Sequence, residues 1–406
     1  MSFSFASSAS PEVSASPEAS PSHPLAPYGW DAGWEAEFTP YAERGLVPGR
    51  VVRVDRGLCD VVTPAGPVRA DTEYVVPRDP MRVVCTGDWV ALDAGGDPRF
   101  VRTLLPRRTA FVRSTSSKRS EGQVLATNVD HIVICVSLAA ELDLGRVERF
   151  LALAMSSSTG AALLRESAPA RVSGAARESG AAGEREAAPL VVLTKADLVA
   201  DPAVLAHLVK DVESAAPGVP VLAVSAETGE GVDVLSAVVS DGTSVLLGVS
   251  GAGKSTLANA LFGGPLMEVQ AIRDVDGKGR HTTTTRNLIV LPSGGVLIDT
   301  PGLRGVGLWD AENGVGQVFS EIESLADGCR FHDCAHGAEP GCAVLAAVAD
   351  GSLSDRRLES YRKLLRENKR IVAKTDARLR AEIRRDWKRM GAEGRAAMDA
   401  KRGKFR

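Results

Sequence analysis

The spacing of hydrophobic residues changes near residue 128, and this change predicts different folds on the two sides. Residues 47–105 contain short segments in which apolar and polar residues alternate, separated by turn sequences such as P-A-G-P and A-G-G-D. Alternation with a period of two is typical of half-buried β-strands. Short strands over this length predict a small all-β barrel, and the OB-fold is one candidate for it.

Continuous apolar segments replace the alternation in the middle of the chain. They are typical of strands covered on both faces of a sheet, and they lie at residues 129–137, 190–193, 219–224 and 245–248. Amphipathic helical patterns separate them, at residues 144–155, 203–215 and 232–239. This repetition predicts an α/β domain with a parallel, doubly wound sheet. Two further apolar segments around P-S-G-G predict a hairpin at residues 288–291 and 295–299.

Three segments carry no pattern that could fill a core. Residues 1–44 begin with a Ser-, Ala- and Pro-rich stretch that lacks the basic and apolar blocks of a secretory signal, so we expect a poorly ordered tail. Residues 107–126 are basic and rich in Ser, and they predict a linker. Residues 156–188 are dominated by Ala, Ser, Gly, Glu and Arg, and they predict a flexible insertion in a surface loop.

The chain is therefore predicted to be multidomain, as its length of 406 residues also suggests. The small all-β, OB-like barrel is placed at residues 45–106, and the α/β domain is placed at residues 127–306. A small, mostly helical domain is placed at residues 307–354. A basic helical tail follows at residues 355–406.

Charge is distributed unevenly along the chain. Residues 355–406 hold 19 Lys and Arg against 8 Asp and Glu, although the whole chain has a formal net charge of −3. The tail is thus basic and the body acidic, which indicates either a polyanionic partner or a solvated helical face. No apolar segment is long enough to span a bilayer, so no membrane partner is expected.

One segment carries the pattern of a phosphate-binding loop. Residues 248–255 read G-V-S-G-A-G-K-S and match G-x-x-x-x-G-K-[ST], between an apolar strand and a helical pattern. Backbone N–H groups of such a loop surround phosphates, the lysine neutralises their charge, and the hydroxyl of the next residue binds Mg²⁺. The predicted nucleotide-binding residues are Gly248, Val249, Ser250, Gly251, Ala252, Gly253, Lys254, Ser255 and Thr256.

Two segments upstream of this loop are suited to reading a guanine base. The first follows a predicted strand and consists of Thr194, Lys195, Ala196 and Asp197. An Asp carboxylate there can accept two hydrogen bonds from guanine that adenine cannot supply. Threonine stands where Asn is usual, so one base or loop contact must be lost or replaced. The second segment, Ser225 and Ala226, follows the next strand and can present backbone N–H groups to guanine O6.

The order of these segments is unusual for a domain that binds GTP. Base-reading segments normally follow the phosphate-binding loop, but here they precede it, and D-T-P-G at residues 299–302 follows it. Asp299 can hold Mg²⁺ through water, and the N–H of Gly302 can contact the γ-phosphate. The order of motifs therefore predicts a circularly permuted P-loop GTPase domain.

Six cysteines fall into two groups, and their spacing fits a reducing cytoplasm rather than a disulfide framework. Three are isolated among apolar neighbours and predict buried thiols, namely Cys59, Cys85 and Cys135. The others cluster with histidine, and the candidate zinc ligands are Cys329, Cys334, His336 and Cys342, with His332 as a rival. Three thiolates and one imidazole would fill a tetrahedral site and leave no open position, so we expect one structural Zn²⁺.

Together these motifs resemble those of the bacterial GTPases that depend on the small ribosomal subunit. That family is circularly permuted and has an N-terminal OB-fold and a C-terminal zinc domain. The resemblance covers about residues 45–365 and also rests on G-D-W-V at 87–90, N-V-D at 128–130 and G-R-H-T-T-T at 279–284. It favours His336 over His332 as the zinc ligand. It implies GTP or GDP and Mg²⁺ as cofactors, and the small ribosomal subunit with its rRNA as the partner of a cytoplasmic protein, which we expect to be a monomer.

The resemblance also assigns a switch segment that responds to the nucleotide. One Thr of residues 282–285 closes onto Mg²⁺, and Thr283 is favoured among its neighbours. His281 is a candidate either for aiding hydrolysis or for a structural role in the loop. Leu303 stands where Ras-like enzymes place a Gln that orients water, so we expect slow hydrolysis that the subunit stimulates during its late maturation.

Three other functions remain open on the sequence. The chain could be an RNA-binding assembly module that uses bound nucleotide structurally, because Thr194 and Leu303 depart from the usual GTPase pattern. It could be an ATP-using enzyme with the same phosphate-binding loop. It could also be another permuted GTPase of ribosome assembly, although the barrel-first and zinc-last layout argues against that.

Overall fold

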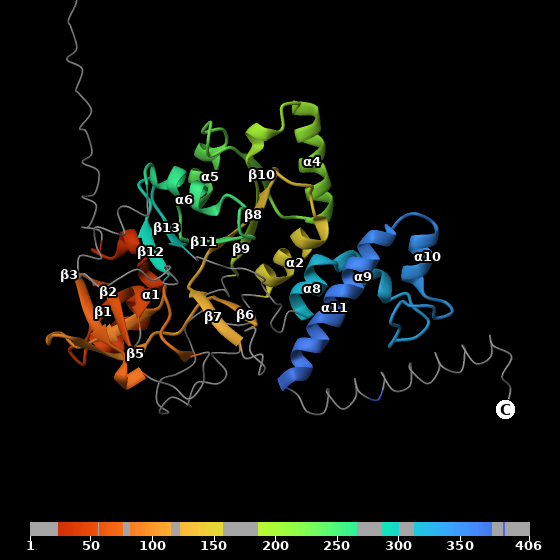
Figure 1. The fold of residues 1–406 in the computed structure, drawn as a ribbon. Helices are drawn as coiled ribbons and strands as arrows, with labels where there is room; N and C mark the ends of the chain where they lie inside the picture. The colour runs from red at the N-terminus through yellow and green to blue at the C-terminus, as the bar shows by residue number, and fades with distance from the viewer. Residues whose placement is uncertain are drawn as a thin grey trace, which may run out of the picture.

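A computed structural model of the chain describes residues 23–55, 57–75, 82–114, 122–156, 186–265, 286–299, 312–375 and 385. The chain runs from a β-barrel, drawn in red and orange, through an α/β region in yellow and green, to a group of helices in blue (Figure 1). In the described part of the chain, no helix is both long and apolar enough to cross a membrane.

The barrel consists of five strands, β1 (Val47–Asp55), β2 (Leu58–Thr63), β3 (Gly66–Asp71), β4 (Trp89–Leu92) and β5 (Arg99–Leu104). Strand β1 pairs with both β2 and β4, and β3 pairs in parallel with β5, so the sheet closes on itself. The interior is apolar and includes Val51, Val61, Val90 and Val101. A short helix, η2 (Glu73–Val75), follows β3. The predicted OB-like barrel is confirmed.

Residues 23–44 are ordered against the barrel, so the prediction of a poorly ordered tail was wrong for them. They form η1 (Ala26–Tyr28) and α1 (Ala32–Ala42). Trp30, Trp34 and Phe38 are buried, and the ring of Trp30 lies edge-on to that of Trp89 at 4.8 Å. The Ser- and Pro-rich composition of the first residues hid these aromatic anchors, which bury a large apolar area.

The predicted basic linker at residues 107–126 also contains regular structure. Strands β6 (Ala110–Ser114) and β7 (Gly122–Thr127) pair antiparallel, with Phe111 and Leu125 fully buried. Arg107 is buried too, because its guanidinium donates to both carboxylate oxygens of Asp88 at 2.7 Å. The prediction of a linker was wrong for these residues, because the sequence alone does not distinguish a buried, paired arginine from a solvated one.

The six strands of the α/β region and the five strands of the barrel belong to one 11-stranded sheet. The six strands of the α/β region lie in the order β10-β9-β8-β11-β13-β12. The strands are β8 (His131–Ser137), β9 (Ala188–Thr194), β10 (Val221–Val224), β11 (Thr243–Leu247), β12 (Asn287–Val290) and β13 (Val296–Asp299). All neighbours pair in parallel except β12 and β13, which form the predicted hairpin. Both predictions for this region are confirmed. Residues 157–185 of the predicted insertion lie outside the described residues.

Helices cover both faces of this sheet, which explains its continuous apolar strands. In β8, Ile132 and Ile134 face a core shared with α2 (Leu144–Met155) and α4 (Pro202–Ala215). Val133 and Cys135 face a second core shared with α5 (Val232–Val239) and α6 (Lys254–Phe262). Alternate side chains of one strand therefore stabilise opposite layers.

Arg50 of β1 lies at the junction between the barrel and the α/β region. It is 1% exposed, and its guanidinium donates to Tyr28 O and to Thr243 Oγ1, each at 3.1 Å. It also lies 4.7 Å from the centre of the Trp89 ring. Burial lowers the pKa of Arg50 to about 10, against an opposing effect of Asp130 and Asp88.

The sequence motifs at residues 87–90 and 128–130 meet at the same junction. Asn128 donates from Nδ2 to Gly87 O at 2.9 Å, and Asp130 accepts from Thr243 N at 2.7 Å. A side chain at Gly87, where φ is +98°, would place its Cβ 2.3 Å from Thr127 O. These motifs therefore hold the barrel onto the start of β11.

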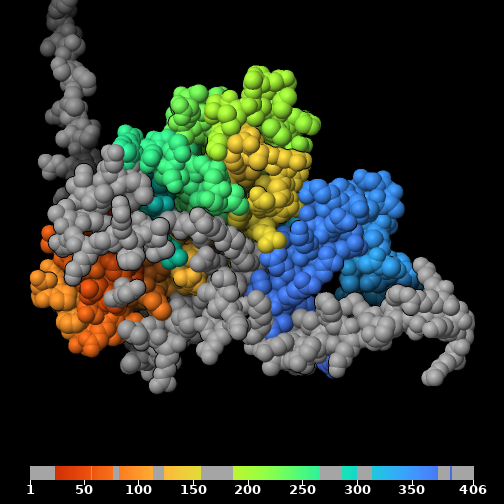
Figure 2. All heavy atoms as spheres, viewed as in Figure 1, coloured from red at the N-terminus to blue at the C-terminus, as the bar shows by residue number. Residues whose placement is uncertain are grey.

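The C-terminal helices pack on the opposite side of the α/β region. They are α8 (Glu312–Val318), α9 (Ser320–Ala326), α10 (Ala343–Ala349) and α11 (Asp355–Thr375). Figure 2 shows this blue group against the yellow surface formed by the α2 region. Helix α8 packs closely on α2, because a Cβ on Gly314 would lie only 2.1 Å from Ala152 O. Most of residues 376–406 lie outside the described residues.

Arg357 of α11 lies at the centre of this second junction. Its guanidinium donates to Glu148 of α2 at 2.8 Å and to Glu321 of α9 at 2.6 Å. It also donates to the carbonyl oxygens of Val318, at 2.5 Å, and of Ala215, at 3.0 Å. Glu148 is fully buried and Arg357 is 5% exposed. The buried side chain of Arg357 therefore links α11 to four other helices, α2, α4, α8 and α9.

Candidate functional site

The candidate nucleotide site lies where the carboxyl ends of four parallel strands meet. Strands β9, β10, β11 and β13 are each followed at this edge by one of the predicted motifs. Ligands of doubly wound sheets bind outside the carboxyl ends of the strands, so the edge is a suitable place for a nucleotide.

The phosphate-binding loop joins β11 to α6 in the arrangement that the sequence predicts. Gly248 passes so close to β8 that an added Cβ would lie 2.6 Å from Cys135 O. Gly253 has φ of +80° and precedes Lys254, the first residue of α6. Glycines at these two positions let the backbone turn tightly and start the helix with its N–H groups directed at the loop.

Lys254 lies over the loop, and Asp299 lies at the end of the adjacent strand β13. The ammonium of Lys254 donates to Gly248 O and Val249 O, each at 2.7 Å. Burial lowers the pKa of Lys254 and raises that of Asp299, and each group opposes the shift of the other. The two charges therefore act on one small region, as a site for phosphates and Mg²⁺ requires. Ser255 and Thr256 are exposed in the first turn of α6.

The guanine-reading segment lies directly beside the phosphate-binding loop. The hydroxyl of Thr194, the last residue of β9, donates to Ala252 O at 2.8 Å. Lys195 has φ of +60°, and this left-handed turn leads into η4 (Ala196–Leu198), which contains Asp197. The contact brings together two segments that are 58 residues apart in sequence.

The second base-reading segment contacts the first through a buried hydroxyl. Ser225 Oγ donates to Asp197 Oδ1 at 2.6 Å and accepts from Thr228 N at 3.1 Å. Ser225 is fully buried, Ala226 is half-buried, and Asp197 is exposed at the edge of the sheet. The hydroxyl therefore fixes one oxygen of the carboxylate that we expect to read guanine.

Several predicted residues fall where the structure gives no description. His281, Thr283, Gly302 and Leu303 lie outside the described residues, so their roles stay predictions. At Thr194 the sequence left open whether a contact is lost or replaced, and in the structure its hydroxyl makes a contact with the loop at Ala252 O. Away from this site, no role was predicted for Glu148 of α2, although its position within an apolar helical pattern was an available signal.

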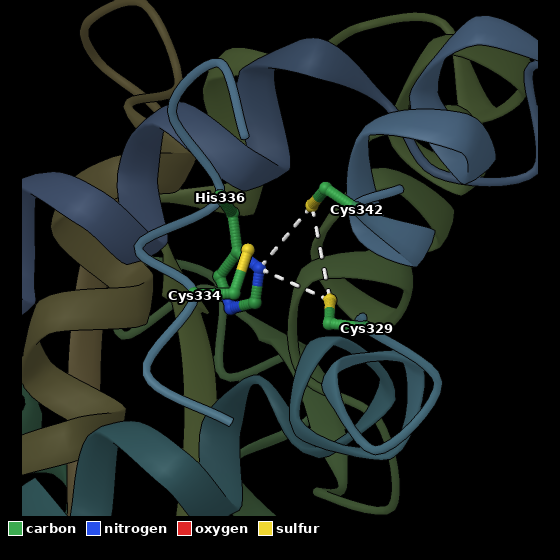
Figure 3. Close-up of side chains that lie close together, drawn as sticks. All are labelled: Cys329, Cys334, His336 and Cys342. Atoms are coloured by element: carbon green, nitrogen blue, oxygen red, sulfur yellow. Dashed lines mark hydrogen bonds between the residues drawn. The ribbon is translucent and has the colours of Figure 1, made fainter. Parts of the chain in front are cut away.

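Four side chains near the C-terminus converge on one point (Figure 3). The ligand atoms of Cys329, Cys334, His336 and Cys342 all lie within 4.8 Å of one another. The two sulfurs of Cys329 and Cys342 are 3.8 Å apart, and they lie 3.6 Å and 3.5 Å from His336 Nδ1. Tetrahedral Zn²⁺ with ordinary bond lengths requires about 3.8 Å between sulfurs and about 3.6 Å between sulfur and nitrogen. The group is compatible with zinc, and His332 is not part of it.

The backbone around this cluster is held by local hydrogen bonds. Cys342 precedes α10, and its sulfur accepts from Leu345 N at 3.4 Å. His336 has φ of +55°, in a loop whose N–H groups donate to the carboxylate of Glu339. Gly341, directly before Cys342, has φ of +75° and turns the chain there.

Comparison with known proteins gives consistent results. The sequence model of the RsgA GTPase family matches residues 176–309. "Small ribosomal subunit biogenesis GTPase RsgA" of Streptomyces avermitilis is 72% identical, over 95% of this chain and 97% of that protein. The protein of the same name from Methanosarcina acetivorans is 38% identical, over 84% of each chain.

Solved structures share the fold. YjeQ from Thermotoga maritima is similar with a TM-score of 0.53 and 24% identity, over 80% of this chain and 98% of that one. YloQ, described as a circularly permuted GTPase, is similar with the same TM-score and 20% identity, over 80% of this chain and 95% of that one. With the high identity to curated relatives over nearly the whole length, these findings show that the chain belongs to the RsgA family of circularly permuted GTPases.

Proposed function

We propose that this protein hydrolyses GTP on the small ribosomal subunit during late maturation of the subunit, and that the subunit stimulates hydrolysis. Relatives 72% and 38% identical to the chain carry the name small ribosomal subunit biogenesis GTPase. One observation gives the nucleotide assignment its strongest support, the 2.8 Å hydrogen bond from Thr194 to Ala252 O. It joins a segment suited to guanine and a segment suited to phosphates, as a GTP site needs.

The triphosphate end of the site is assigned as follows. Lys254 neutralises the β- and γ-phosphates, and the N–H groups of the loop and of the first turn of α6 surround them. The hydroxyls of Ser255 and Thr283 and, through water, Asp299 would hold Mg²⁺, which would supply further positive charge to the phosphates. The N–H of Gly302 contacts the γ-phosphate, and His281 aids hydrolysis.

The base end of the site is assigned to the two upstream segments. Asp197 accepts hydrogen bonds from the N1–H and the exocyclic amine of guanine, which adenine lacks in that arrangement. The stem of Lys195 lies over the base plane, and the N–H groups of Ser225 and Ala226 donate to guanine O6. The site therefore selects GTP over ATP.

The C-terminal cluster is assigned one structural Zn²⁺, because four protein ligands leave no open position. Metal analysis of freshly purified protein should give about one Zn²⁺ per chain. Cys342→Ser should abolish zinc binding. His332→Ala changes an exposed histidine of the same loop and should leave the zinc content unchanged. Protein without zinc, or equal loss in both variants, would count against the assignment.

Hydrolysis by the isolated protein is expected to be slow. Leu303 cannot hydrogen-bond a water molecule, so the attacking water lacks the side chain that orients it in Ras-like enzymes. We propose that docking on the subunit orders or supplies the missing group. The protein would then act as a timer that releases the subunit after hydrolysis.

The partner surface is expected to include α11. Lys363, Arg366 and Arg370 are exposed, and their spacing places them on one side of this helix. Contacts between such residues and rRNA phosphates would weaken as salt increases. Replacing all three with Gln should reduce subunit affinity and its salt dependence without changing nucleotide affinity. We assign the activity to a monomer in the cytoplasm, where ribosomal subunits mature.

The decisive experiment is GTP turnover with small subunits titrated in at two salt concentrations. We expect turnover to rise with subunit concentration and to need more subunits at the higher salt. Lys254→Ala should abolish GTP turnover at both salt concentrations. Fast turnover of the isolated protein that subunits leave unchanged would contradict the proposal, as would equal affinity for GTP and ATP.

A further inference from the structure

Thr194 is the point at which the guanine-reading segment contacts the phosphate-binding loop. It is 4% exposed and pairs with Ser137 of β8 and Val224 of β10, so three strands fix its position. Its hydroxyl donates to Ala252 O at 2.8 Å, and a Cβ on Gly253 would lie 3.3 Å from Thr194 Oγ1. The loop is thus shaped closely around this hydroxyl.

The hydroxyl of Thr194 has only one proton to donate. Its nearest acceptor is Ala252 O at 2.8 Å, and Val136 O is more distant at 3.3 Å. The proton is therefore committed to the loop, and none remains to donate to a base. An Asn side chain has two N–H donors and an oxygen acceptor, so the residue present here can keep the loop contact but not an additional amide contact.

A second hydroxyl performs a different task in the same site. Ser225 Oγ donates to Asp197 Oδ1 at 2.6 Å, and it is fixed by the N–H of Thr228. Its partner is the carboxylate assigned to the base rather than a carbonyl of the loop. Two buried hydroxyls thus lie at the ends of two neighbouring strands, one directed at the phosphate side and one at the base side.

We infer that Thr194 is a positioning residue for the phosphate-binding loop and takes no part in discriminating between purines. Discrimination in this chain falls to Asp197, which Ser225 orients. This division of labour rests on the proposed function, because it concerns the same GTP site. It implies that affinity for the nucleotide and preference for guanine can be changed separately.

The test compares nucleotide affinities of full-length variants, measured by competition with a fluorescent guanine nucleotide. Thr194→Val keeps the branched shape and removes the hydroxyl, so it should weaken GDP and GTP binding about tenfold and leave the ratio of ATP to GTP affinity unchanged. Thr194→Ser retains the hydroxyl and should stay within about twofold of the parent. Ser225→Ala should instead reduce the preference for GTP over ATP about tenfold.

Each failure of this test has a distinct meaning. A parent protein that binds ATP as well as GTP would remove the proposed function itself. A parent with guanine preference, combined with a Thr194→Val variant that binds GDP normally or that loses the preference, would overturn the inference alone. If Thr194→Val does not fold, as judged by zinc content and thermal unfolding, Thr194→Ala removes the same hydroxyl with less bulk and is judged by the same two readouts.

Discussion

The two junctions of this molecule are both centred on a buried arginine, but the two arginines have opposite chemical surroundings. At the barrel junction, Arg50 donates to neutral oxygens and its pKa is lowered to about 10 by burial. At the C-terminal junction, Arg357 is paired with the carboxylates of Glu148 and Glu321. Arg50 has carboxylates nearby, Asp130 and Asp88, but its hydrogen bonds to Tyr28 O and Thr243 Oγ1 go to neutral oxygens. Arg357 is bonded directly to carboxylates, and a buried carboxylate that loses such a partner is strongly destabilising.

This difference predicts how each junction fails. Removing Arg50 takes away a poorly solvated charge and leaves only neutral acceptors behind. Removing Arg357 leaves the fully buried carboxylate of Glu148 with Arg356, at 3.0 Å, as its one remaining partner among the described residues. The barrel junction should therefore tolerate substitution better than the C-terminal junction, although both look equally buried.

Metal removal should have the largest effect and should be confined to the C-terminal side. Chelation is expected to make three thiols react quickly at pH 8, those of Cys329, Cys334 and Cys342. The other three should stay protected, because Cys59, Cys85 and Cys135 are buried within the barrel and the α/β region, which chelation leaves folded. Mass spectrometry after brief alkylation counts the labels. Six labels would show that the two sides are not independent.

Arg357→Met should have the next largest effect, a loss of about 3–5 kcal/mol in the stability with which α8 and α11 are docked, because it removes the buried partner of Glu148 and leaves only the half-exposed Arg356 beside that carboxylate. Amide hydrogen exchange of peptides from these helices measures this loss directly. The matched control is the double variant Glu148→Leu/Arg357→Met, which removes both charges and should recover most of the protection. If these helices are protected from exchange as well in Arg357→Met as in the double variant, the unpaired charge of Glu148 is not what destabilises this junction.

Arg50→Met should cost less, about 1–3 kcal/mol, because the groups left without a donor are neutral. Urea unfolding followed by tryptophan fluorescence is a suitable measurement, since Trp30, Trp34 and Trp89 all lie close to this junction. The methionine keeps apolar contact with the Trp89 ring. A loss as large as that of Arg357→Met would show that the counter-charge is not what distinguishes the two junctions.

Arg149→Ala should have the smallest effect. Arg149 of α2 pairs with Glu367 of α11 at 2.7 Å, but both side chains are more than a quarter exposed. Pairs of this kind contribute about 0–1 kcal/mol because solvent screens them. Hydrogen exchange of α11 should therefore change little. The difference between Arg149→Ala and Arg357→Met then measures how much burial adds to the effect of losing an ion pair at this junction.

The elements of this fold could be predicted where their signal is local. The period of hydrophobic residues and the motif G-x-x-x-x-G-K-[ST] are local, and they predicted the barrel, the strands of the α/β region and the phosphate-binding loop, but not β6 and β7. The order of motifs around the loop then predicted the permuted domain. The spacing of Cys and His is also a local signal and predicted the zinc cluster, whereas the family resemblance was needed to favour His336 over His332.

The features that could not be predicted depend on partners far away in sequence. Arg107 looked like part of a basic linker because its partner Asp88 lies 19 residues earlier. Trp34 and Phe38 looked like part of a tail because the barrel surface that buries them is formed by later strands. The hydrogen bond from Thr194 to Ala252 O could not be predicted for the same reason, since only the folded sheet brings these two segments together.

The separation of Glu148 from Arg357 also matters while the protein is being made. The two residues are 209 positions apart, so α2 leaves the ribosome long before α11 exists. Until then, the surface of α2 that α8 and α11 will cover is exposed on an unfinished chain, and it is largely apolar. Glu148 lies in the middle of that surface and can stay hydrated until Arg357 arrives, so the cost of burying its charge arises only when its partner is present.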